Sequence, residues 1–145
     1  MKITVNTDGA SRGNPGPGSI GVVVSNEKGE VIKKYAEFLG ERVTNNEAEY
    51  EAIIFSLKKL KLLLGKEKVK KVEVEFKSDS ELLVKQMSGN YKIVEKGLQE
   101  LFMKIWNLKT EFGRIDFVHI PRERNKEADK LANQALDENL RKSLF

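Results

Sequence analysis

Polar and apolar residues alternate with a period of two along several short segments, which is the pattern of strands with one buried face. We expect five strands, at residues 2–8, 20–25, 31–39, 70–77 and 114–120. The first three are separated by a Gly/Pro-rich connection at residues 9–18 and by a turn at residues 26–29. These short connections predict that the first three strands form an antiparallel meander.

A period of about 3.6 residues predicts helices in the remaining segments. The longest helix should begin at Thr44, with Glu47 at the capping-box spacing, and end at Gly65. Its apolar stripe consists of Ile53, Ile54, Leu57, Leu60 and Leu64. Ser78 and Glu81 have the same capping-box spacing and predict a short helix whose inward residues are Leu82, Leu83 and Met87.

Two further helices follow. The first carries an apolar stripe of Leu98, Leu101, Phe102, Ile105 and Leu108. Pro121 should end the fifth strand, and Asn125 should cap a last helix. The inward residues of that helix are Ala128, Leu131, Ala132 and Ala135.

The order of these elements is β-β-β-α-β-α-α-β-α, which predicts an α/β fold with a mixed sheet and helices on its faces. The 145 residues are expected to form a single domain, with residues 139–145 as a frayed end. A chain of this length buries about 68–70% of its unfolded surface, enough for a core without disulfides or structural metals.

Composition restricts the chemistry that the protein can perform. Cysteine is absent and His119 is the one histidine, which excludes disulfides, thiol nucleophiles, zinc–thiolate sites and multi-histidine metal sites. The ligands of any bound metal must therefore be carboxylates, which favour hard ions such as magnesium or manganese. No secretory leader precedes the first strand, and the apolar runs are too short to span a bilayer, so we expect a cytoplasmic protein with no membrane partner.

The net charge of +4 is unevenly distributed along the chain. Seven lysines form a cluster that is interrupted by a single acid, Glu67: Lys58, Lys59, Lys61, Lys66, Lys68, Lys70 and Lys71. This lysine cluster is either a solvated helix face with its following loop, or a surface that binds nucleic-acid phosphates.

Four carboxylates occupy positions that do not suit a solvent-facing surface: Asp8, Glu49, Asp79 and Asp129. The last three each precede inward apolar residues by three or four positions, so they lie on the buried side of a helix. Asp8 ends the first predicted strand, where an open sheet tends to place its binding crevice.

Each of these acids also has a purely structural explanation. Asp8 and Gly9 are typical of a turn, and the other three lie near helix N-termini, where a negative charge stabilises by about 0.3–1 kcal/mol. Four acids gathered at one edge of a sheet would nevertheless repel one another and lose hydration, which costs several kcal/mol. Divalent cations relieve that repulsion, and carboxylates that hold Mg²⁺ are suited to phosphate substrates.

The chain resembles the type 1 ribonuclease H family along nearly its whole length, and in particular the family's archaeal-like branch. The matching segments are TDGASRGNPGPGSIGVVV, TNNEAEYEAI, KSDSELLVKQM and PRERNKEADKLAN. The order and spacing of the four segments together make this resemblance specific. It implies a five-stranded sheet of order 3-2-1-4-5, and it carries the family's four acidic positions onto Asp8, Glu49, Asp79 and Asp129.

The resemblance implies endonucleolytic hydrolysis of the RNA strand of RNA–DNA hybrids, giving 5′-phosphate and 3′-hydroxyl ends. Two Mg²⁺ ions, for which Mn²⁺ could substitute, would bind with the substrate, one activating water and the other stabilising the leaving oxygen. Asp8 would bind both ions, Glu49 and Asp79 one of them, and Asp129 the other. We expect the protein to act as a monomer.

Substrate binding is implied in the same way. The RNA 2′-hydroxyls would be contacted by Gly9, Ala10, Ser11, Asn45 and Asn46. Arg42 and Thr44 match a pocket for a phosphate of the DNA strand, and Asn14 matches a contact in the same groove. Asn45 and Asn46 could instead serve only the turn that enters the helix.

The sequence departs from many relatives at three places. The loop before Asp129 lacks a histidine, so Arg122 or Glu123 occupies that role or no residue does, and we expect His119 to be packed within the fifth strand. Glu81 stands where the family often has a glutamine that contacts a base. The lysine- and tryptophan-rich handle of some relatives is reduced to Tyr91, Lys92 and Lys96.

The sequence therefore leaves three functions open. The first is a hybrid-specific ribonuclease, and the second is an enzyme of the same fold that also cuts double-stranded RNA, as some members of the archaeal-like branch do. The third is an inert nucleic-acid binding module. The presence of all four acids argues against the third.

Overall fold

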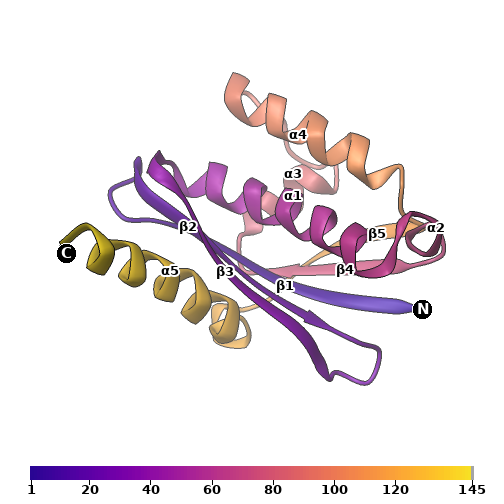
Figure 1. The fold of residues 1–145 in the computed structure, drawn as a ribbon. Helices are drawn as coiled ribbons and strands as arrows, with labels where there is room; N and C mark the ends of the chain where they lie inside the picture. Colours follow the sequence, from indigo (N-terminus) through magenta and orange to yellow (C-terminus); the bar gives the residue numbers. More distant parts are fainter. Residues whose placement is uncertain (145) are drawn as a thin grey trace.

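Five strands form one mixed sheet, of order β3-β2-β1-β4-β5, in the computed structural model, which describes residues 1–144 (Figure 1). The strands are β1 (Lys2–Ser11), β2 (Gly16–Ser25), β3 (Val31–Val43), β4 (Glu73–Ser78) and β5 (Arg114–His119). β1, β2 and β3 pair antiparallel, whereas β4 pairs parallel with both β1 and β5. The expected meander and strand order are both confirmed.

Helices cover both faces of the sheet, as expected. They are α1 (Asn45–Leu64), α2 (Lys66–Val69), α3 (Glu81–Met87), α4 (Lys96–Lys109) and α5 (Lys126–Leu144), with a 3₁₀ turn at Arg122–Arg124. α1 lies on one face with α4 packed outside it, and α5 crosses the other face against β1, β2 and β3 (Figure 1). α5 is helical through Leu144, so the frayed end at residues 139–145 stays a prediction, and Phe145 lies outside the described residues.

The largest core lies between the sheet and α1. Ile53, Leu57 and Leu60 of the predicted stripe are almost fully buried and belong to one cluster with Val5 and Phe76 of the sheet. Thr44 and Glu47 form the expected capping box, and Gly65 ends the helix with a positive φ. The periodicity of this segment therefore predicted the helix, its bounds and its buried face.

The strands of the first hairpin are longer than expected. β1 continues to Ser11 and β2 begins at Gly16, so residues 9–11 and 16–18 belong to strands and the connection shrinks to residues 12–15. Glycine and proline do not prevent pairing here because the backbone of residues 8–11 has a partner in residues 18–21. β4 starts at Glu73, not at residue 70, because residues 66–69 form α2.

The capping box expected at Ser78 is wrong. Ser78 is still in β4, where its carbonyl accepts from the N–H of Ile120, and Ser80 is the residue that caps α3 by accepting from Leu83. This shift leaves Leu82 37% exposed, whereas Leu83 and Met87 are buried as expected. Glu81 instead pairs with Lys85, at 2.7 Å.

Asn125 precedes α5 as expected, but its side chain does not cap the helix in the way we predicted. Its Nδ2 donates to the carbonyl of Thr7 at 2.8 Å, and its Oδ1 accepts from Asn6 at 3.2 Å. The Asn125 side chain points toward β1 because α5 packs directly on the sheet. Asn125 is 2% exposed. Within residues 1–144, no helix is long and apolar enough to cross a membrane.

Candidate active site

Asp8 lies where the sheet opens between β1 and β4. The parallel pairing of these strands reaches Asn6 and Lys77 and goes no further, and β4 ends at Ser78. We expected Asp8 to end its strand, but β1 continues beyond it because it remains paired with β2. The side chain therefore stands on a continuous, paired strand beside the gap that β4 leaves.

Glu49 is brought to Asp8 by a close contact between β1 and α1. A Cβ atom on Gly9 would lie 2.4 Å from the backbone nitrogen of Glu49 and from the backbone carbon of Ala48. Only a glycine at this position allows the strand to approach the first turns of α1 so closely. Glu49 is 8% exposed, and its Oε2 is buried with no hydrogen-bond partner among residues 1–144.

Asp79 directly follows β4 and completes a compact group of three acids. One oxygen from each of Asp8, Glu49 and Asp79 lies within 4.8 Å of the others, which is a spacing at which one cation could bind all three. Asn125 donates to Oδ1 of Asp79 at 3.3 Å. Because Asn125 also binds the carbonyl of Thr7, it ties Asp79 to the strand that carries Asp8.

Asp129 approaches Asp8 from the opposite face of the sheet. It lies in the first turn of α5, close enough to Asp8 for a side-chain hydrogen bond between the two carboxyl groups. The helix is this close because Gly21, the pairing partner of Asp8 in β2, has no side chain. A Cβ at Gly21 would lie 1.9 Å from the carbonyl oxygen of Ala128.

This crowding changes the acidity of the site. Burial raises the pKa of Asp8 from 3.8 to about 7, with further contributions from the charges of Asp79 and Asp129, while Arg122 lowers it. Burial, followed by the charge of Asp8, also raises the pKa of Glu49 well above its usual value. Buried carboxylates that resist ionisation, one with an unpartnered oxygen, fit a site for divalent cations, whose charge would reverse these shifts.

The four acids line a cleft of about 360 Å³. The expected substrate-binding residues Gly9, Ala10, Ser11, Asn45 and Asn46 lie along the same cleft. The carboxylates and the backbone that the resemblance assigns to RNA therefore share one surface.

The other expected contact residues lie outside this cleft. Asn14 accepts the N–H of Asn45 at 2.9 Å, so it links the β1–β2 connection to the start of α1. Thr44 accepts the N–H of Glu47 at 3.1 Å as the helix cap. Arg42 is exposed near the end of β3.

Ser80 and Asn133 line the cleft although they were not expected in the site, and Arg122, a candidate for the role of the missing histidine, lines it too. Arg122 stands in the loop that lacks the relatives' histidine, and its guanidinium is near enough to Asp8 to lower the pKa of that carboxyl. Asn133 follows Asp129 by one helical turn, a spacing that could have identified it. Ser80 is adjacent to Asp79.

His119 does not have the packed environment that we expected. It is exposed, because it is the last residue of the edge strand β5. The pKa of Glu81 is lowered mainly by Lys85, with a smaller effect of His119. Neither His119 nor Glu81 lines the cleft.

Comparison with known proteins agrees with this fold. Residues 6–135 match the family described as reverse transcriptase-like. A bifunctional protein of Mycobacterium tuberculosis is 38% identical over 138 residues, and the ribonuclease HI of Halobacterium salinarum is 37% identical over 131 residues. These alignments cover 94% and 90% of this chain, but 36% of the mycobacterial protein and 62% of the halobacterial one.

Two solved structures are similar over almost their full length. LC11-RNase H1 in complex with an RNA/DNA hybrid has a TM-score of 0.90 and 47% identity, covering 95% of this chain and 99% of that chain. RNase H1 from Halobacterium salinarum has a TM-score of 0.86 and 33% identity, with coverage of 95% and 99%.

The strand order and the helices on the sheet are those of the ribonuclease H-like class of proteins, as in these RNase H1 structures. Together with these similarities, they show that the chain belongs to the type 1 ribonuclease H family.

Proposed function

We propose that this protein hydrolyses the RNA strand of RNA–DNA hybrids, leaving 5′-phosphate and 3′-hydroxyl ends. One observation carries the proposal: Asp8, Glu49 and Asp79 meet within 4.8 Å in a cleft that also contains Asn45 and Asn46. The complex of LC11-RNase H1 with an RNA/DNA hybrid supports the same substrate for a chain of this similarity.

The four acids are proposed to bind two divalent cations, Mg²⁺ or in its place Mn²⁺. When bound, such ions activate a water molecule as nucleophile and stabilise charge on the leaving oxygen. Asp8 is close to Glu49 and Asp79 and also to Asp129, so Asp8, Glu49 and Asp79 would hold one cation, and Asp8 and Asp129 would hold the other. Asp8 and Glu49 hold protons more readily than free carboxyl groups, and they release them when they bind a cation.

The cleft walls would position the two strands. Backbone groups of Gly9, Ala10 and Ser11, with the amides of Asn45 and Asn46, are proposed to contact RNA 2′-hydroxyls, which distinguish RNA from DNA. The Asn14–Asn45 hydrogen bond supports this assignment because it holds together the two segments that face the RNA.

Charged and polar residues in and around the cleft would bind backbone phosphates. Arg42 and Thr44, at the end of β3 and the start of α1, are proposed to bind a phosphate of the DNA strand, with Asn14 as a further contact in the same groove. The positively charged guanidinium of Arg122 lines the cleft, where it can face the phosphate of the RNA.

Cleavage of an end-labelled hybrid, measured beside double-stranded RNA of the same sequence with Mg²⁺ or Mn²⁺, tests the proposal. We expect metal-dependent cutting of the hybrid that Asp8→Asn abolishes. The matched control is Asp116→Asn, which removes a half-exposed carboxylate on β5 outside the cleft and should leave the rate unchanged.

The double-stranded RNA determines whether the activity extends beyond hybrids. A folded wild-type protein that binds the hybrid but cuts neither duplex with either metal would overturn the proposal in favour of a binding module.

A further inference from the structure

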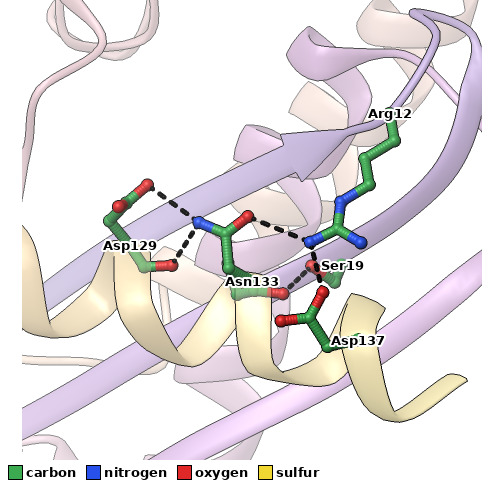
Figure 2. A network of polar contacts seen from close by, with 6 residues as sticks. Arg12, Ser19, Asp129, Asn133 and Asp137 are labelled. Atoms are coloured by element: carbon green, nitrogen blue, oxygen red, sulfur yellow. Dashed lines mark hydrogen bonds and ion pairs between the residues drawn. The ribbon is translucent and has the colours of Figure 1, made fainter. Parts of the chain in front are cut away.

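Asn133 contacts Asp129 from within the cleft. It lies on α5 one turn after Asp129 and lines the same cavity as the four acids. Its Nδ2 donates to the main-chain carbonyl of Asp129 at 3.1 Å and to the carboxylate Oδ1 at 3.4 Å (Figure 2). One carboxylate oxygen of Asp129 is thus engaged by Asn133.

The orientation of the Asn133 amide is determined by Arg12. The guanidinium Nη2 of Arg12 donates to Oδ1 of Asn133 at 3.4 Å and to Oδ1 of Asp137 at 2.7 Å (Figure 2). A guanidinium has donors and no acceptor, so the oxygen of the amide must face it. The NH₂ group of Asn133 faces the two acceptor oxygens of Asp129.

The geometry of α5 makes this contact possible. Asp129, Asn133 and Asp137 are spaced four residues apart and share one face of the helix. The same part of the helix is attached to the sheet by Ser19, whose hydroxyl donates to the carbonyl of Ala132 at 2.5 Å (Figure 2). This hydrogen bond therefore fixes the distance of Asn133 from the strands of the sheet.

Arg12 also connects this helix face to the hairpin proposed to bind RNA. It follows Ser11, whose hydroxyl donates to the carbonyl of Val43 at 2.5 Å, and precedes Asn14, which accepts from Asn45. The connection at residues 12–15 is consequently bound to α1 on one side and to α5 on the other. If this hairpin moved, the guanidinium of Arg12 would transmit the movement through Asn133 to Asp129.

A role in stability alone explains these contacts poorly. The side chains of Arg12 and Asp137 are 42% and 63% exposed, and exposed ion pairs contribute little to the free energy of unfolding. Their position beside Asn133, which is partly buried in the cleft, indicates a role in the site.

We propose that Asn133 is a positioning residue for Asp129, and that Arg12, held by Asp137, fixes the amide orientation that this role requires. The inference rests on the proposed function, in which Asp129 is a cation ligand. Without Asn133, the Asp129 carboxylate can rotate away from the charge of Asp8, and the cation site on that side loses its preorganisation. Groups that orient a metal ligand in this way typically change metal affinity or activity about 10–100-fold.

The test measures the Mn²⁺ requirement of hybrid cleavage, the KM for hybrid, and Mn²⁺ binding to the metal-free protein by calorimetry. For Asn133→Ala we expect about a tenfold higher Mn²⁺ requirement and weaker Mn²⁺ binding, with the KM for hybrid unchanged at saturating Mn²⁺. Arg12→Ala should have a smaller effect in the same direction, and Arg12→Lys should restore part of it. Gln134→Ala, an exposed residue of the same helix that bonds only to Glu138 among the described residues, is the matched control and should behave as wild type.

The double variant tests whether Arg12 acts through Asn133. If it does, Arg12→Ala combined with Asn133→Ala will require no more Mn²⁺ than Asn133→Ala alone. Additive effects would overturn the part of the proposal that concerns Arg12. A rise in KM alone for Asn133→Ala would mean that Asn133 contacts RNA and does not position Asp129.

Asp129→Asn separates this inference from the proposed function. If Asp129→Asn raises the Mn²⁺ requirement and Asn133→Ala leaves it at the wild-type value, the positioning role is wrong while the cation site stands. If the wild-type protein neither binds Mn²⁺ nor cuts hybrid, the proposed function itself fails.

Discussion

Asp8 illustrates how strongly the surroundings of one residue change its chemistry. In the sequence it is an aspartate before a glycine, but in the fold it is 7% exposed and close to three other acids. Its pKa of about 7 results first from burial and then from the charges of Asp79 and Asp129. The cluster is therefore destabilising in the metal-free protein at neutral pH, and a bound cation would relieve that cost.

The pH dependence of stability follows from this pKa. Because the folded protein binds the proton of Asp8 more tightly than the unfolded chain does, the stabilisation is fully present below about pH 4 and is lost as the pH rises through 7. Asp8→Asn should therefore be more stable than wild type at pH 8, by at most about 4 kcal/mol, and nearly equal to it at pH 4. Urea unfolding in the presence of a chelator measures both values.

The control for this measurement is Asp116→Asn, which removes a half-exposed carboxylate elsewhere on the sheet. It should show no gain at pH 8. An equal gain of Asp8→Asn at both pH values would show that ionisation of Asp8 is not the cause.

At the level of elements, two glycines determine how closely the helices approach the sheet. Gly9 allows α1 to contact β1, and Gly21 allows α5 to contact β2. Asp8 lies between them, since it precedes Gly9 and pairs with Gly21. The two contacts bring Glu49 and Asp129 to Asp8 from opposite faces of the sheet.

Gly21→Ala should accordingly destabilise the fold, because its Cβ would lie 1.9 Å from a backbone carbonyl of α5. Overpacking typically costs about 1–3 kcal/mol, and a clash with backbone belongs at the upper end of that range. Gly40→Ala is the control, since its Cβ would be 3.8 Å from the nearest side-chain atom. Equal free energies of unfolding for the two variants would contradict the proposed role of Gly21.

At the scale of the whole molecule, the last part of the lysine cluster and the acids lie at opposite ends of α1. Glu49 is near the start of this 20-residue helix, which is about 30 Å long, and Lys66, Lys68 and Lys70 follow its end. These three lysines are exposed, and none of them lines the cleft. For these three lysines, the structure therefore favours the first of the two interpretations, a solvated surface.

Replacing Lys66, Lys68 and Lys70 with alanine should leave the KM for a short hybrid within about twofold of wild type, because phosphate contacts contribute to affinity only where the duplex reaches them. Arg42→Ala, near the start of α1, should raise that KM. The comparison is best made at low salt, where phosphate contacts contribute most. A several-fold higher KM for the triple lysine variant would show that the cluster does bind the duplex.

The sequence by itself determined the type and order of the five strands and the four longer helices, the main core helix and the four acids. These depend on periodicities and caps within a few neighbouring residues, such as Thr44 with Glu47. Tertiary structure decided the rest: the extent of β1 and β2 across a glycine-rich segment, the side chain of Asn125 facing the sheet, and Arg12 beside Asn133. Contacts of this kind join residues that are distant in the chain, such as Arg12 and Asp137. They form only when packing brings whole elements together, so no local pattern encodes them.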